Sequence, residues 1–212
     1  MNIRLKNKAA IQIHNSEDIY SVMQRILLRE EKGDRGREHF WTISLDNANK
    51  ILNIELVSMG SFRATIVEPM EVFSIPLQKR AVKLVLIHNH PSGTLKPSEA
   101  DKDVTDHMIQ VGRIMNVQLI DHLIITENSY YSFANSGLLE ELSRSLKYVP
   151  AFEIKRRYEK QAEEKGKEKG NKEGRREMAR MMKKENYPIE EIVKLTGVSK
   201  SIINRLKTTD KK

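Results

Sequence analysis

Cysteine is missing altogether from the 212 residues of this chain. Without thiols the protein can form no disulfide bond, so nothing in the composition supports an oxidising compartment. Sites in which thiolates hold a metal are excluded for the same reason. A metal centre in this protein would have to be built from histidine and carboxylate side chains.

Long apolar runs are missing as well. No charge-free apolar stretch approaches the ~20 residues that a membrane span needs. Residues 1–10 are basic but lack the apolar core of a signal peptide. We therefore expect a cytoplasmic protein with no membrane partner.

An excess of one charge sign is missing from the first two thirds of the chain. Residues 1–148 contain 18 lysines and arginines and 18 aspartates and glutamates, whereas residues 149–212 contain 19 and 11. The whole net charge of +8 therefore lies in the C-terminal tail. Attraction to nucleic acid depends on such a basic excess, so any affinity for DNA is expected in the tail.

Two histidines follow an apolar run in the middle of the chain. Residues 84–87 read Leu-Val-Leu-Ile, which is typical of a strand buried on both faces. His88 and His90 come next, and on a strand this spacing places both side chains on one face. Pro91 and Gly93 then turn the chain. The histidines are expected at the C-terminal end of the strand, where open α/β sheets place ligand sites.

A serine and an aspartate follow the histidines. Ser98 resembles the N-cap of a helix, and Asp101 falls in its first turn, from which the carboxylate can point back at the histidines. A Ser-x-x-Asp pair alone is a common capping pattern, and a lone histidine is usually structural. The combined spacing is far more specific. Catalytic zinc takes three nitrogen and oxygen ligands and leaves a fourth position for water. The combined spacing therefore predicts a metal site at His88, His90 and Asp101.

The pattern H-x-H, seven residues, S-x-x-D is the JAMM (JAB/MPN) metalloprotease motif. The chain resembles the RadC branch of that family over residues 11 to 139. The residues that carry this resemblance are the sequence around His88, His90, Ser98 and Asp101, together with Thr105 and the pair Asp121-His122 further along the chain.

The resemblance implies an α/β fold, a three-layer cytidine-deaminase-like domain with a mixed sheet. It also implies Zn²⁺ held by His88, His90 and Asp101, an oxyanion stabilised by Ser98, and an upstream glutamate as general base. Relatives outside the RadC branch are isopeptidases, so a peptide or isopeptide substrate is expected. The motif itself does not support the DNA-repair label of the RadC branch.

Glu38 is the glutamate that best matches the position of the base. It begins a segment rich in aromatic and β-branched residues, 38–45, which is expected to form a strand. A general base must reach the attacking water, a requirement that spacing alone does not test. Five other upstream glutamates therefore remain alternatives: Glu30, Glu31, Glu55, Glu68 and Glu71. His39 is expected to be a bystander on the other face of the strand.

Asp121 and His122 lie within an expected strand, 117–126. Asp121 could orient a ligand histidine from behind, or the two residues could simply be a polar pair at a strand end, and both interpretations stay open. His107, on the expected helix, is predicted to be exposed and is not a ligand candidate.

The remaining elements follow from periodicity and capping. We expect a helix capped by Ser16, an exposed loop at 29–37, and a helix from 68 to about 81 that Pro76 interrupts or kinks. The other expected elements are a hairpin of strands 38–45 and 51–59, a brief strand 64–67, a helix 98–115 ended by Asn116, a last strand 130–133 and a helix 137–146.

The chain is expected to divide into three parts. Residues 11–148 would form the hydrolase domain, residues 149–185 a charged helix-prone linker weakened by its glycines, and residues 186–212 a small helix-turn-helix-like module. Four side chains of that module could face a DNA groove: Lys200, Asn204, Arg205 and Lys207. The alternative is a helical cap or an oligomerisation element.

Two functions are therefore compared. The favoured hypothesis is a zinc-dependent hydrolase of amide bonds, a metallopeptidase or isopeptidase. The alternative is an accessory protein that binds DNA through its basic tail, with a structural or vestigial zinc site. Phosphodiester cleavage is disfavoured because the domain around the site carries no net positive charge.

Overall fold

A computed structural model describes residues 11–60, 67–164 and 170–207. The chain divides into two compact units between Arg144 and Ser145, and each unit is considered by itself. Across the described ranges, no helix combines the length and the apolar character that a membrane span requires.

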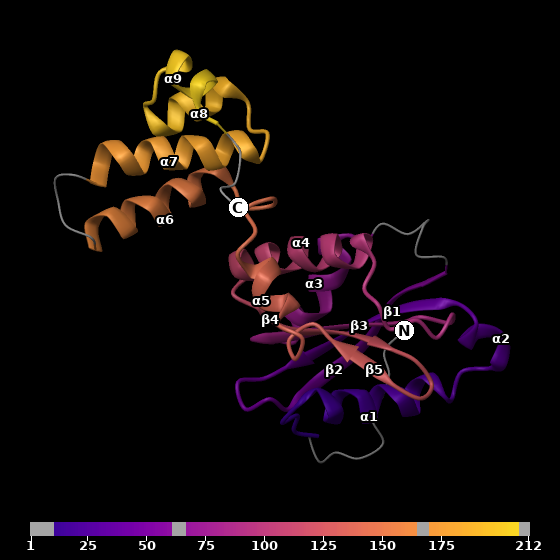
Figure 1. The fold of residues 1–212 in the computed structure, drawn as a ribbon. Helices are drawn as coiled ribbons and strands as arrows, with labels where there is room; N and C mark the ends of the chain where they lie inside the picture. Colours follow the sequence, from indigo (N-terminus) through magenta and orange to yellow (C-terminus); the bar gives the residue numbers. More distant parts are fainter. Residues whose placement is uncertain (1–10, 61–66, 165–169, 208–212) are drawn as a thin grey trace. The chain divides into compact units, whose positions relative to one another are not determined.

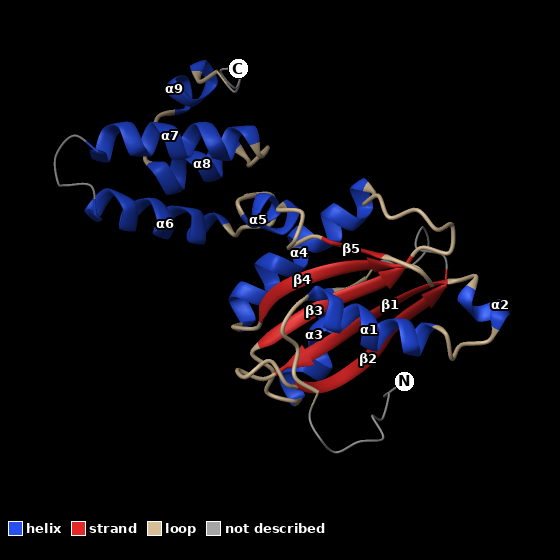
Figure 2. Ribbon diagram, turned by 60° about the horizontal axis from the view of Figure 1, so that its bottom comes forward, coloured by secondary structure: helices blue, strands red, loops and turns tan. Residues whose placement is uncertain are grey.

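The first unit is built on a five-stranded mixed sheet (Figure 2). The strands lie in the order β2-β1-β3-β4-β5, and β3 and β4 are parallel while every other neighbouring pair is antiparallel. Their bounds are Glu38–Leu45 (β1), Ile51–Gly60 (β2), Lys83–Asn89 (β3), Gln118–Ile125 (β4) and Tyr130–Ser132 (β5). The expected hairpin and mixed α/β character are confirmed.

Helices cover both faces of this sheet (Figure 1). Helix α1 (Ser16–Leu27) packs on one face, and helices α3 (Pro69–Gln78) and α4 (Glu99–Met115) pack on the other. Strand side chains alternate between the two apolar cores. In β3, Val85 and Ile87 face α1, whereas Leu84 and Leu86 face α3 and α4. His88 comes next in this alternation and therefore lies on the same face as Leu84 and Leu86.

Several local predictions need correction. The N-cap of α1 is Asn15 rather than Ser16, since the Asn15 side chain accepts a hydrogen bond from the Asp18 amide. The loop at 29–37 contains a one-turn helix, α2 (Lys32–Arg35). Pro76 lies inside α3 without ending it. The expected strand 64–67 lies outside the described residues except for Val67, which is not in a strand. The last helix of the unit, α5 (Leu138–Ser143), is shorter than expected.

In the described part of the second unit, four helices surround one apolar core. They are α6 (Ala151–Glu164), α7 (Gly170–Lys184), α8 (Ile189–Thr196) and α9 (Lys200–Arg205). This arrangement differs from the expected linker, because Met178 and Met182 of α7 share the core with Ile192 and Ile203 of the expected module. The two methionines are four residues apart on one helix face, surrounded in sequence by charged residues that hide the periodicity.

Candidate metal centre

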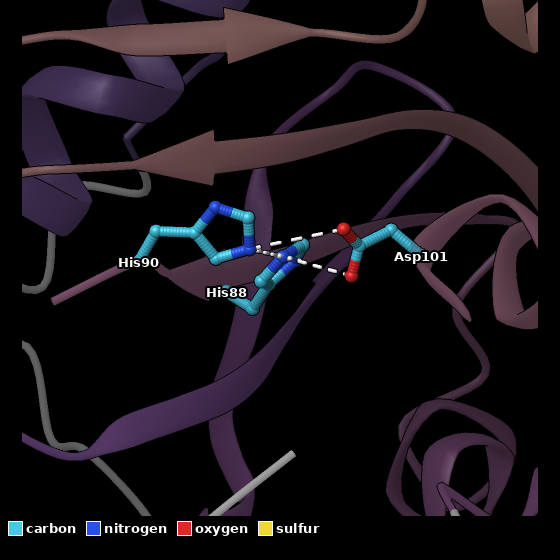
Figure 3. A group of neighbouring side chains, drawn as sticks. All are labelled: His88, His90 and Asp101. Carbon is cyan, nitrogen blue, oxygen red and sulfur yellow. Dashed lines mark hydrogen bonds and ion pairs between the residues drawn. The ribbon is translucent and has the colours of Figure 1, made fainter. Parts of the chain in front are cut away.

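Three side chains converge at the C-terminal end of β3 (Figure 3). One potential ligand atom from each of His88, His90 and Asp101 lies within 4.8 Å of the others. The two Nε2 atoms are 3.0 Å apart, and Asp101 Oδ1 lies 3.2 Å from His88 Nε2. The structure thus brings together the three residues that the spacing selects as ligands.

Local structure on both sides of the turn fixes this convergence. His88 is still within β3, whereas His90 has left it and donates its amide to the carbonyl of Ile125 in β4. The Gly93 amide closes the turn on the His90 carbonyl, with Gly93 at φ +79°. Helix α4 then starts at Glu99 with Asp101 in its first turn. The strand end and the helix start therefore face the same point.

Hydrogen bonding fixes the tautomer of His90. Its Nδ1 lies 2.7 Å from the carbonyl oxygen of Thr94, which can only accept. Nδ1 must therefore carry the proton. In the neutral imidazole, the Nε2 of His90 is left with a lone pair that points toward His88 and Asp101.

A chain of three hydrogen bonds fixes His88 in the same way. The Thr105 hydroxyl is 2.5 Å from the Asp101 carbonyl and donates its one proton there. It must then accept from His122 Nδ1, 2.7 Å away. Burial is the largest cause that lowers the pKa of His122 well below its usual value, which favours the neutral ring, whose Nε2 accepts. The partner of that Nε2, at 2.8 Å, is His88 Nδ1, which must donate.

Two lone pairs therefore meet at 3.0 Å, because His88 and His90 both have their Nε2 atoms directed at one point. Two acceptors at this distance repel unless a cation lies between them. The same point is faced by a carboxylate. A proton or a metal ion must occupy it, and two imidazole nitrogens with a carboxylate oxygen are a donor set that suits zinc.

The Asp101 carboxylate is divided between two tasks. Its Oδ2 accepts hydrogen bonds from the amide and the hydroxyl of Ser98, both at 2.7 Å, in a capping box that starts α4. Its Oδ1 is buried and has no hydrogen-bond donor among the described residues. Burial alone would raise the pKa of Asp101, but the neighbouring imidazole of His88 and the hydrogen bonds from Ser98 hold it well below its usual value. An ionised, orphaned Oδ1 fits a metal ion.

Asp121 does not reach this centre. Its carboxylate lies on the α1 side of the sheet, where Oδ2 accepts from the hydroxyls of Ser16 and Ser132 at 2.8 and 2.7 Å. Its Oδ1 accepts from the amides of His122 and Ala134. The interpretation in which Asp121 orients a ligand histidine is therefore wrong. His122, on the opposite face of β4, contacts the candidate ligand His88.

The register of β1 places Glu38 at the end of the sheet where His88 and His90 lie. Phe40 pairs with His88, so Glu38, two residues earlier, lies on the same face and opposite the position of His90. Its side chain is half-buried. Among the alternatives, Glu31, Glu68 and Glu71 are exposed, Glu30 is half-buried at the end of α1's exit turn, and Glu55 pairs with Thr42 in the middle of the sheet.

The other singled-out residues lie elsewhere. His39 is buried and stacks on Trp41, away from the ligand face, as expected of a bystander. His107 is half-buried rather than exposed. The four tail residues Lys200, Asn204, Arg205 and Lys207 are all exposed, in or just after α9. Thr94 and Thr105 contribute to the site through contacts that no spacing rule predicts.

Comparison with known proteins gives a family match over the first unit. Residues 13–138 match the family model of the RadC-like JAB domain. The chain is 42% identical over 127 residues to a UPF0758 protein of Flavobacterium johnsoniae, covering 60% of this chain and 53% of that protein. It is 38% identical over 128 residues to a UPF0758 protein of Methanosarcina barkeri, covering 60% and 54%. The chain spans about half the length of the curated relatives it matches.

Proposed function

Because the chain belongs to the RadC-like JAB domain family, which contains JAMM-type hydrolases, we propose that it is a zinc-dependent hydrolase of amide bonds in a peptide or isopeptide. The observation that carries the proposal is the convergence of two lone pairs, from His88 and His90, on the orphaned Oδ1 of Asp101. We assign the activity to residues 11–148, with the three-layer arrangement of cytidine deaminases.

Zinc in such a site supplies a nucleophile, by lowering the pKa of a coordinated water to about 7, and polarises the carbonyl of the substrate. His88, His90 and Asp101 would hold the ion, and zinc held by three protein ligands keeps a further position for water. His122 and Thr105 keep the imidazole of His88 in the tautomer that can bind it.

Glu38 acts as the general base. It accepts a proton from the attacking water and returns it to the nitrogen of the leaving amine, so that one carboxylate serves both halves of the reaction. Its position at the start of β1, on the ligand face of the sheet, supports this role.

Ser98 stabilises the oxyanion by donating its hydroxyl proton. That proton is now donated to Asp101 Oδ2. Because a hydroxyl has one proton, Ser98 must release Oδ2 as the oxyanion forms. Asp101 Oδ2 still accepts from the Ser98 amide after this rotation, so the ligand stays in place.

The proposal is tested by zinc analysis together with hydrolysis of internally quenched peptides carrying either an α-peptide or a lysyl ε-isopeptide bond. We expect one zinc per chain in the wild type and in Glu38→Gln, and turnover in the wild type alone. The matched control is Glu71→Gln, an exposed glutamate on α3 that should keep full activity. Zinc-loaded protein with equal turnover in the wild type and Glu38→Gln would contradict the mechanism.

We propose nucleic-acid binding by the second unit as the alternative function. The basic excess of residues 149–212 and the exposure of Lys200, Asn204, Arg205 and Lys207 favour it. Each phosphate contact that is lost should flatten the salt dependence of binding.

The test compares duplex DNA binding of the full chain and of Lys200→Glu/Arg205→Glu across salt concentrations. We expect weaker binding and a smaller salt slope in the double variant, and no change in Lys194→Glu, an exposed lysine of α8. Equal loss in both variants would indicate a bulk charge effect, and no binding in the wild type would exclude this function.

A further inference from the structure

We infer that Asn89, the residue between the two ligand histidines, is the positioning residue for the general base Glu38. The inference rests on the proposed function, because a base is needed only if the metal centre hydrolyses a substrate. It concerns a side chain that takes no part in holding the metal and whose identity the H-x-H pattern leaves open.

The carboxamide of Asn89 bridges the main chain on both sides of Glu38. Its Oδ1 accepts a hydrogen bond from the amide of His39 at 2.7 Å, and its Nδ2 donates to the carbonyl of Arg37 at 2.9 Å. The side chain is 2% exposed, so water does not compete for these bonds. The one residue enclosed by the two bonds is Glu38.

These bonds continue the pairing of β1 with β3 beyond the point where the main-chain hydrogen bonds between the two strands end. The last registered pair between β1 and β3 is Phe40 with His88. Beyond it, the amide of His90 turns to Ile125 of β4. The carboxamide of Asn89 offers one donor and one acceptor in the arrangement of a peptide group, so it replaces the next rung. It thereby fixes the backbone of Glu38 where the ladder has already ended.

Because Asn89 is covalently joined to both ligand histidines, the same residue connects the base to the metal site. A displaced ligand or a displaced base would each change the distance across which the proton moves. Misplacement by 1 Å is enough to lower a rate by ~100-fold. A role confined to stability would tie down the strand end without linking Glu38 to the chemistry.

The test uses the full chain loaded with Co²⁺, whose visible absorption bands report the coordination shell. We compare the wild type, Glu38→Gln, Asn89→Leu and the double variant at one pH. Leucine keeps the size of asparagine but has no hydrogen-bonding group. Asn89→Ala serves as a second variant, since the space it leaves lets water satisfy Arg37 and His39 if the leucine variant does not fold.

We expect one cobalt per chain in all four proteins and a changed spectrum in Glu38→Gln, because the water in the shell loses its acceptor. Asn89→Leu should show the same change, and the double variant should add nothing to it. On the quenched peptides, Asn89→Leu should lower kcat ~100-fold with an unchanged KM. The matched control is Asn53→Leu, a buried asparagine of β2 opposite Ser44 that should keep the wild-type spectrum.

The failures of the two proposals are distinguishable. A changed spectrum in Glu38→Gln with a wild-type spectrum in Asn89→Leu and Asn89→Ala overturns the positioning role and leaves the base in place. Loss of cobalt from both Asn89 variants also overturns it, because Asn89 would then support the ligands. A wild-type spectrum in Glu38→Gln overturns the assignment of the base itself, and the inference with it.

Discussion

The metal end of the sheet and the C-terminal unit treat polar groups in opposite ways. At the metal end, His88, Asp101 and His122 are completely buried, and each has a hydrogen-bond partner that sets its protonation and direction. Among the described residues of the C-terminal unit the core is apolar and no charged side chain is fully buried. Lys183 is a half-buried cation that donates to the main-chain carbonyls of Ile203, Asn204 and Leu206, at the end of α9.

This difference shows which contacts serve chemistry. Burying a polar group is costly unless its bonds are satisfied, so a domain that needs only stability keeps such groups outside, as the C-terminal unit does. The metal end instead buries a connected network, and one atom of it, Asp101 Oδ1, is left without a donor. Substitutions in the buried network of the metal end should therefore lower metal affinity, whereas substitutions in the C-terminal unit should lower stability alone.

The largest effect is expected from removing a ligand. Asp101→Asn replaces the charged Oδ1 by a neutral group and disturbs the capping box of α4. Loss of a residue that only orients a ligand costs 10- to 100-fold in affinity, so loss of the ligand should lower zinc affinity by more than ~100-fold. A competition titration against a chromophoric chelator measures it. Asp103→Asn, nearby on α4, is the control, and equal loss there would contradict the assigned ligand.

Asp121→Ala should give the largest effect on stability. It leaves the amides of His122 and Ala134 without an acceptor, at a cost of ~1–3 kcal/mol for the buried amide of His122 and less for the part-buried amide of Ala134. Urea denaturation measures the free energy of unfolding. We expect Asp121→Asn to lose less, because its carbonyl oxygen can still accept from the two amides. Equal losses in the two variants would show that these bonds contribute little.

The difference in stability between the wild type and Asp121→Asn should depend on pH, and the sign of this dependence follows from the pKa of Asp121. Burial raises the pKa of Asp121 in the folded protein, against the opposing hydrogen bonds from Ser132, Ala134, Ser16 and the His122 amide. A raised pKa in the folded state means that stability from this group is present at low pH and is lost as the pH rises through the folded value. The disadvantage of Asp121→Asn relative to the wild type should therefore shrink with rising pH over that range.

His122→Phe should have a smaller effect than loss of a ligand and should act on the metal. Without the acceptor Nε2, His88 Nδ1 loses its partner and the tautomer of His88 is no longer fixed. We expect zinc affinity to fall 10- to 100-fold, as measured by chelator competition. Asp121→Asn, one residue away on the opposite face of β4, is the control for zinc affinity. A similar loss in both would mean that the effect comes from the strand and not from the imidazole.

The sequence predicted the local part of this site well and the non-local part poorly. The apolar run, the i, i+2 histidines and the Ser98 cap bring the three candidate ligands together, because each signal depends on neighbours within one element. The roles of Asp121 and His122 depend on which face of β4 meets α4. That choice is set by pairing with β3 and by an irregularity of register between Leu84 and Val85.

Asn89 and the core of the C-terminal unit were beyond prediction for related reasons. The partners of Asn89 are His39 in β1 and Arg37 just before it, about 50 residues away, so no local spacing indicates them. In α7, Met178 and Met182 stand among charged residues, which predict a solvated linker until α8 and α9 supply the surface that covers them. Sequence periodicity detects a face only when most of its residues are apolar.

The smallest effect is expected from Lys183→Met, which sharpens the comparison from the side of the C-terminal unit. Lys183 Nζ donates to the carbonyls of Ile203, Asn204 and Leu206 at 2.8–3.0 Å, where the last turn of α9 leaves carbonyls without helical partners. A cation at a half-buried helix C-terminus contributes ~0.3–2 kcal/mol, and methionine keeps the apolar stem while removing the donor. Thermal unfolding should show this loss in Lys183→Met and none in Lys184→Met, whose side chain is exposed.

Zinc content should stay at the wild-type value in both variants, since neither residue belongs to the unit that contains the candidate ligands. A fall in zinc content would show that the two units do not act independently.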